Sequence, residues 1–166
     1  MLRTRLNSAY LKRTFRVLYG NTQATPKSCF LDSAWDRSTP IWPGMVMTKG
    51  VGENVTLISG TTQAPYGFSA LYVGGDGIDE PLDVGVNVFA VWVLGPDAEA
   101  EVLAPAFDTT LTYTDTSGTE FLLYAGTTGA NKGKIVVAGT SGATTTPIAR
   151  LLKVNSPTKI TIGGLR

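Results

Sequence analysis

Short runs of alternating apolar and polar residues, separated by turns rich in Gly and Pro, restrict the fold of this chain more than any other feature. They begin at Met45–Met47 and Asn54–Ile58 and continue to the C-terminus. A period of two puts every second side chain on the same face of a strand. Strands of this kind at intervals of about 8–12 residues are typical of a β-barrel or a β-sandwich.

The most apolar of these runs, Val84–Leu94, predicts a strand buried on both faces, and Gly95–Asp97 closes it as a turn. The other predicted strands cover residues 66–73, 100–104, 109–114, 120–125, 134–138, 148–154 and 158–162. The fold class predicted from the sequence is therefore all-β.

Residues 1–40 lack this alternation and predict an N-terminal basic arm, with residues 41–166 as a single β-rich body. Leu2, Leu6 and Tyr10 have the i, i+4 spacing of a short helix. The stretch Thr22–Pro26 predicts a break in regular structure, and Ile41–Gly44 a turn into the body.

Charge is divided into three blocks along the chain, although the net charge is only +1. Residues 1–49 contain eight basic and two acidic residues, residues 50–131 contain eleven acidic and no basic residues, and residues 132–166 contain six basic and no acidic residues. Two interpretations follow: the blocks pair within one subunit, or the basic arm meets an acidic surface on a neighbouring molecule. Nucleic-acid binding is disfavoured, because the acidic middle block repels phosphate.

The residues that are absent exclude several kinds of chemistry. The chain has no histidine, so Ser-His-Asp and Cys-His catalysis cannot occur within it. The single cysteine, Cys29, cannot form an internal disulfide or a thiolate zinc site, and we expect it to be a small buried apolar residue. The longest apolar run, Val88–Leu94, is far shorter than the ~20 residues of a membrane-spanning helix. We therefore expect no cofactor, no metal and no membrane partner.

Two groups of acidic residues are the candidates for other chemistry. Carboxylates gathered beside a Gly-rich loop are compatible with Ca²⁺, and an alternating group would share one face of a strand, as the paired acids of a glycosidase do. The first group is Asp76, Asp79, Glu80 and Asp83, and the second is Asp97, Glu99 and Glu101. Exposed acidic loops are common, so we expect neither group to be an active or metal site.

Seven residues are the candidates for binding a partner. Trp35 and Trp42 flank prolines, and we expect them to anchor the arm to the body or to a neighbour. The basic residues of the arm are expected to meet acidic patches on a capsid protein or on a neighbouring copy. They are Arg3, Arg5, Lys12, Arg13 and Arg16.

Three parts of the sequence resemble the capsid decoration, or cement, proteins of tailed bacteriophages. They are Ile41–Val46, Ala64–Phe68, and the C-terminal pair Pro147–Val154 and Lys159–Ile162. The resemblance implies a small, β-tulip-like body on the outer surface of a phage head, often as a homotrimer. It also implies that the protein binds the major capsid protein and bridges neighbouring subunits, without catalysis.

Two other functions remain open at this stage. One is a carbohydrate- or receptor-binding β-sandwich of a phage fibre or tail, which would need an exposed aromatic patch that includes Trp35 or Trp42. The other is a hydrolase that uses two facing carboxylates, one with a pKa raised by burial.

Overall fold

The computed structural model of the chain describes residues 14–19, 23–32, 35, 39–73, 88–114 and 120–166. Apart from a short 3-10 turn, η1 (Gly129–Asn131), the regular structure of these residues consists of strands. The strands are β1 (Phe15–Tyr19), β2 (Ala24–Leu31), β3 (Val46–Lys49), β4 (Asn54–Leu57), β5 (Pro65–Ser69), β6 (Val88–Leu94), β7 (Glu99–Leu103), β8 (Phe121–Ala125), β9 (Ile135–Val137), β10 (Ala149–Ser156) and β11 (Lys159–Gly163).

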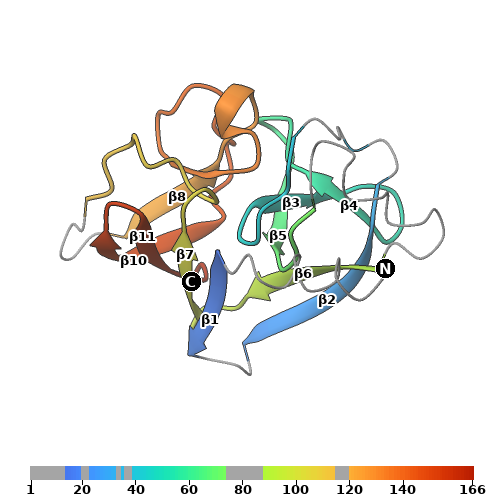
Figure 1. Cartoon of the computed structure of the whole chain (residues 1–166), viewed down its shortest axis with the longest axis horizontal. Helices are drawn as coiled ribbons and strands as arrows, with labels where there is room; N and C mark the ends of the chain where they lie inside the picture. Colours follow the sequence, from blue (N-terminus) through green and yellow to red (C-terminus); the bar gives the residue numbers. More distant parts are fainter. Residues whose placement is uncertain (1–13, 20–22, 33–34, 36–38, 74–87, 115–119) are drawn as a thin grey trace, which may run out of the picture.

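The strands form two regions that lie side by side (Figure 1). The first is a closed barrel in the order β2-β4-β3-β5-β6, and the second is a six-stranded sheet in the order β1-β7-β11-β10-β8-β9. The predicted all-β class with a barrel is therefore confirmed. All pairings in both regions are antiparallel except for a short parallel contact between β2 and β4.

One apolar core joins the barrel and the sheet. The ring of Phe15, in the sheet, stacks on the ring of Phe68, in the barrel, with centroids 5.3 Å apart. The alternation of β7 shows how the sequence directs burial: Ala100 and Val102 are fully buried, while Glu101 lies between them on the other face. Burial of these apolar side chains is the main term that stabilises the packing of the two regions.

The predicted strand at residues 109–114 is wrong, although its alternating pattern resembles that of its neighbours. Asp108 accepts hydrogen bonds from the backbone N–H of Thr110 (2.9 Å) and from its hydroxyl (2.7 Å). The Tyr113 hydroxyl donates to the carbonyl of Asp108 at 2.9 Å. These local bonds hold the chain in a turn, because a side chain that satisfies the backbone competes with strand pairing.

The strand predicted at residues 66–73 ends earlier, at Ser69. The Ser69 hydroxyl bonds both backbone groups of Leu71, donating to the carbonyl at 2.6 Å and accepting from the N–H at 3.2 Å. Ala70 still donates its N–H to the carbonyl of Ala90 in β6 at 2.9 Å, and two residues after Leu71 the chain bridges to Ile41 instead, at Val73. The predictions for Met45–Met47 and Asn54–Ile58, and for the strands from residue 120 onward, agree with the structure to within three residues at each end.

Residues 14–31, assigned to the predicted arm, contribute strands to both regions. β1 pairs with β7 in the sheet, and β2 pairs with β6 and β4 in the barrel. The predicted break at Thr22–Pro26 is wrong from Ala24 onward, since Pro26 lies within β2. The helical spacing at Leu2, Leu6 and Tyr10 lies outside the described residues, as does the rest of residues 1–13.

Cys29 is a buried free thiol in the barrel, as expected for a small apolar residue. Burial raises the pKa of its thiol, with a smaller contribution from Glu53. No helix among the described residues is long and apolar enough to cross a membrane.

Candidate interaction surface

Only one of the five candidate basic residues of the arm lies among the described residues. Arg16 is on β1, with 66% of its side chain exposed. Arg3, Arg5, Lys12 and Arg13 lie outside the described residues. Their proposed contacts with a partner therefore stay predictions.

Arg16 takes part in a cluster of three charges on the outer face of the sheet. Its guanidinium lies 3.5 Å from one carboxylate oxygen of Glu101, and the ammonium of Lys159 lies 3.2 Å from the other. The sheet order places these residues on three adjacent strands, β1, β7 and β11. Glu101 is the least exposed of the three, with 15% of its side chain accessible.

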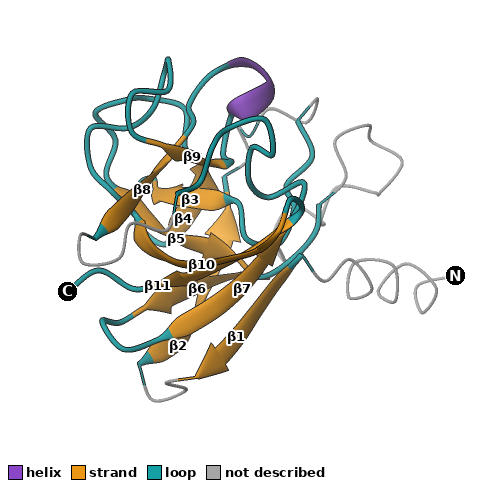
Figure 2. Ribbon diagram, turned by 90° about the vertical axis from the view of Figure 1, so that its left-hand side faces the viewer, coloured by secondary structure: helices purple, strands orange, loops and turns teal. Residues whose placement is uncertain are grey.

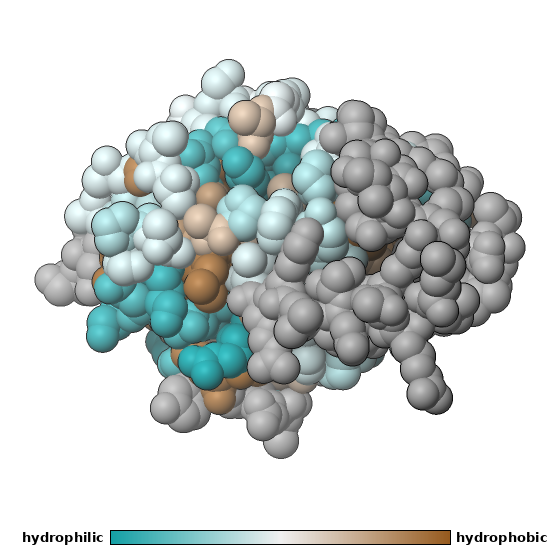
Figure 3. Space-filling model, in the orientation of Figure 1, coloured by the Kyte–Doolittle hydropathy of each residue, from teal (hydrophilic) through white to brown (hydrophobic). Residues whose placement is uncertain are grey.

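The three members of this cluster come from the three charge blocks of the sequence. Arg16 is in the N-terminal basic block, Glu101 in the acidic block and Lys159 in the C-terminal basic block. Figure 3 shows hydrophilic side chains gathered over the sheet side of the molecule. Pairing within one subunit therefore accounts for part of the charge pattern.

In the second acidic group, Glu99 and Glu101 share one face of β7, as their alternation predicts, whereas Asp97 lies in the turn before the strand. Glu101 is bound by two cations, and the carboxylate of Asp97 accepts a hydrogen bond from the side-chain amide of Gln23 at 3.1 Å. The first acidic group, at residues 76–83, lies outside the described residues. Within the part of the chain that is described, no three acidic or cysteine side chains are grouped as metal ligands.

Both candidate tryptophans are partly buried and pack against the core. The indole of Trp42 makes an edge contact with the ring of Tyr72, with centroids 4.8 Å apart. The Nε1–H of Trp35 is buried without a hydrogen-bond acceptor among the described residues. The expected role of both tryptophans, to anchor the arm to the body or to a neighbour, stays a prediction.

Two exposed apolar side chains at one end of the barrel were not predicted from the sequence. Phe30 is 45% exposed on β2, and Val51 is 88% exposed in the turn between β3 and β4. The two are near each other, because the N–H of Phe30 donates to the carbonyl of Glu53 (3.0 Å), two residues beyond Val51. The sequence signal was the motif Gly50-Val51-Gly52, in which a β-branched residue occupies a turn tip.

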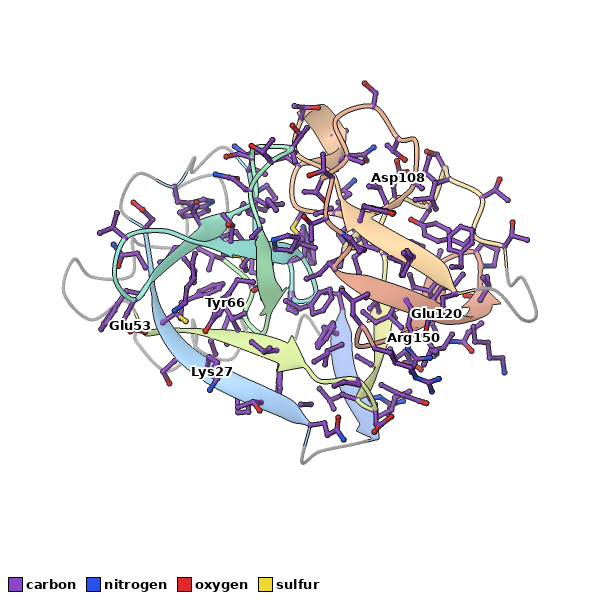
Figure 4. All side chains as sticks on the ribbon, turned by 180° about the vertical axis from the view of Figure 1, so that it is seen from behind. Lys27, Glu53, Tyr66, Asp108, Glu120 and Arg150 are labelled. Atoms are coloured by element: carbon purple, nitrogen blue, oxygen red, sulfur yellow. The ribbon has the colours of Figure 1, made fainter. Side chains whose placement is uncertain are left out.

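Charged residues surround this end of the barrel. The ammonium of Lys49 lies 5.0 Å from the centre of the Tyr66 ring. Figure 4 shows Glu53, Tyr66 and Lys27 on the barrel side, and Asp108, Glu120 and Arg150 on the sheet side. The barrel end therefore offers both apolar and charged contacts, and the sheet offers the charge cluster of Arg16, Glu101 and Lys159 together with the exposed side chain of Val154 on β10.

Besides Cys29, Asp108 and Tyr113 are the described residues whose side-chain pKa is shifted, and they contact each other. Burial acts to raise the pKa of the Asp108 carboxyl, but hydrogen bonds from Thr110 and Asn131 and the nearby Lys134 outweigh it and lower the pKa. Burial, together with the Asp108 charge, raises the pKa of the Tyr113 phenol. The cluster holds a turn in place and presents no open site.

The chain matches the family model of phage cement proteins over residues 1–166, its whole length. It belongs to the phage cement protein family. No curated protein and no solved structure shows a significant similarity to it.

Family membership identifies this phage cement protein as a capsid decoration protein, a structural component associated with the capsid of the virion. The all-β fold with its barrel provides the rigid body of such a component. The expectation from the resemblance is thereby confirmed at the level of family, general function and location.

Proposed function

We propose that this cement protein binds the major capsid protein on the outer surface of the phage head and stabilises contacts between neighbouring capsid subunits. The observation that carries the proposal is the family match over the whole chain. A cement protein must resist the separation of the subunits that it bridges, and many weak contacts repeated around a shell give strong attachment. No catalytic step is part of this function.

Two features of the described residues support a binding role. The apolar side chains of Phe30 and Val51 face solvent at the barrel end, where burial against a partner would remove them from water. The sheet face offers Arg16 and Lys159 around the single carboxylate of Glu101. Basic side chains on such a face favour an acidic partner surface.

The basic residues at Arg3, Arg5, Lys12 and Arg13 are proposed to contact acidic patches on the capsid protein, with Arg16 at the boundary between them and the sheet. Trp35 and Trp42 are proposed to anchor the arm to the body or to a neighbouring molecule. We also propose that the protein assembles as a homotrimer on the shell and does not bind nucleic acid.

The experiment is to add the purified protein to shells assembled without it and to separate the mixture by density-gradient sedimentation. We expect the protein to travel with the shells in a fixed ratio to the capsid protein and to raise the temperature at which the shells break open. A protein that stays at the top of the gradient at all concentrations would contradict the proposal. Glycan and receptor screens would then test the fibre or tail alternative.

A further inference from the structure

The hydrogen-bond pattern shows which backbone groups of β1 point out of the sheet. The N–H of Leu103, on the neighbouring segment of β7, donates to the carbonyl of Thr14 at 2.8 Å. In an antiparallel pair, alternate residues bond to the same neighbour. Thr14 and Arg16 therefore face β7, while the N–H and C=O groups of Phe15 and the N–H of Val17 face away from it. The regular register ends there, because it shifts between Val17 and Tyr19.

No described residue bonds to these outward groups of β1. Figure 2 shows β1 at the margin of the sheet, beyond β7. An open edge of this kind can pair with another extended chain. As far as the described residues go, β1 is therefore a site where a strand can be added.

The opposite edge of the same sheet is closed. Ile135 of β9 donates its N–H to the carbonyl of Ala106 and accepts a bond from the N–H of Asp108, both at 3.0 Å. The segment before the Asp108 turn thus occupies the place that a further strand would take.

The barrel also has an open stretch, in β2, but a proline blocks it. The N–H of Gly95 donates to the carbonyl of Gln23, so Gln23 directs its backbone groups toward β6, whereas the N–H of Phe30 points to the other side and donates to Glu53 beside β4. Because backbone direction alternates along β2, the backbone groups of Pro26 and Ser28 point to the same side as those of Phe30, away from β6. The parallel contact with β4 is limited to Phe30 and Leu31. Pro26 has no N–H with which to bond an added strand at this edge, so it hinders strand addition. An edge is also where a strand tolerates proline, because no bond to a neighbouring strand is lost.

A second copy of the chain is a poor partner for the open edge of β1. Antiparallel pairing of two copies through Phe15 and Val17 would put the two Arg16 side chains directly opposite each other. Like charges directly opposite are destabilising in a sheet. Lys159 adds a further positive charge close by, on the same face of the sheet.

We propose that the open edge of β1 binds an extended segment of the capsid protein as an added strand, with an acidic or neutral residue opposite Arg16. This inference rests on the proposed function. The capsid protein is the partner because cement family membership implies association with the capsid. The edge also follows directly from residues 1–13, which are proposed to contact the same partner. Backbone pairing supplies affinity, and the charge opposite Arg16 supplies selectivity.

The test compares Val17→Pro with Ser28→Pro in binding to shells assembled without the cement protein. Val17→Pro removes an outward N–H from β1 without removing a bond to β7, and Ser28→Pro does the same at the edge of β2 that Pro26 already blocks. We expect Val17→Pro to weaken shell binding by about fivefold or more, and Ser28→Pro to leave it unchanged. Val17→Ala, which keeps the N–H, should bind as the unmodified protein does.

Hydrogen exchange of the unmodified protein provides a second measurement that does not depend on the folding of a variant. We expect the Phe15 and Val17 amides to exchange rapidly in the free protein and slowly on the shell, while the Ser28 amide stays fast in both. Equal binding by the two proline variants, or no added protection at β1, would overturn the inference. Altered self-association of Val17→Pro with normal shell binding would overturn it as well, in favour of a second copy. If the unmodified protein does not bind shells at all, the proposed function fails instead.

Discussion

The barrel and the six-stranded sheet differ in how the edges of their outer strands are paired. The barrel closes on itself, and its remaining open stretch in β2 contains Pro26. The sheet closes one edge through Ala106 and Asp108, and at the other edge no described residue bonds to the outward groups of β1. Within the described residues, the barrel is therefore protected against further pairing, whereas the sheet has one edge at which we propose that a strand is added.

The two regions also differ in the side chains that they expose. The outer face of the sheet carries the charges of Arg16, Glu101 and Lys159, and the end of the barrel carries Phe30 and Val51. Charged contacts set orientation and association rate, and apolar contacts supply affinity. A protein with both kinds of surface on one rigid body is suited to fixing the position of a partner.

The largest expected effect tests whether the two regions depend on one core. Phe68→Ala removes a fully buried ring that stacks on Phe15 across the junction, and we expect a loss of about 3–5 kcal/mol in the free energy of unfolding. Phe30→Ala, at a partly exposed ring, should cost less than about 1 kcal/mol. Urea unfolding followed by fluorescence measures both, and separate transitions for barrel and sheet in Phe68→Ala would show that the two are independent.

The second prediction compares charge near the sheet with charge on the barrel. Changing Arg3, Arg5, Lys12 and Arg13 to Ser should weaken shell binding by about 1–3 kcal/mol at low salt and reduce its dependence on salt. The double variant Lys27→Ser, Lys49→Ser removes barrel charges of the same sign and should change the binding little. Titration of shells at two salt concentrations measures the difference, and equal losses per charge in the two variants would contradict a specific role for residues 1–13.

The third prediction concerns the closed edge of the sheet. Asp108→Asn removes a carboxylate that accepts two hydrogen bonds from Thr110, and we expect a loss of about 1–2 kcal/mol at neutral pH. The pKa of Asp108 is lowered by folding, so its contribution to stability is present above the ordinary pKa of an aspartate and is lost as pH falls through the folded value.

Thermal unfolding between neutral and acidic pH checks this prediction. The difference in stability between the unmodified protein and Asp108→Asn should shrink as the pH falls. A difference that stays constant over the whole range would mean that the charge of Asp108 is not the source of its contribution.

The smallest expected effect isolates the charge cluster on the sheet. Glu101→Gln leaves Arg16 and Lys159 without their shared carboxylate, and we expect a loss of about 0.5–1 kcal/mol in low salt that disappears in high salt. Glu99→Gln changes the same charge on the same strand, where no described residue forms an ion pair with it. Chemical denaturation at two ionic strengths should therefore show a salt-dependent loss of stability for Glu101→Gln and not for Glu99→Gln. Equal losses in the two variants would mean that the effect comes from the change in net charge and not from the ion pairs of Glu101.

Local competition explains where the sequence predictions fail. The alternating residues 109–114 fit a strand, yet the side chain of Asp108 satisfies the backbone of Thr110 first. Pro26 was expected to end regular structure, because proline has no N–H for a bond to a neighbouring strand. At this position the backbone points away from β6, so the missing N–H removes no bond. Neither outcome can be derived from sequence alone, because each depends on which neighbour a backbone group meets.

The candidate contact residues show the same limit. Exposure decides whether an apolar residue is core or contact, and Val51 and Val55 have the same side chain but opposite exposure, 88% and 0%. Trp35 and Trp42 pack partly buried against the core, because large aromatic rings are costly to leave in water, and their role in anchoring the arm to the body or to a neighbour stays a prediction. Phe30 was missed, because nothing in its neighbourhood distinguishes it from the buried residues of β2.

The sequence by itself determined the class of fold, the type of protein and the division of charge. Alternation with a period of two specifies which face of each strand is apolar, and this is a local property. Tertiary structure alone decided that Arg16, Glu101 and Lys159 meet, that β1 is the last described strand of its sheet, and that the outward groups of Phe15 have no described partner. These depend on the order and register of strands distant in sequence, which many long-range contacts fix together.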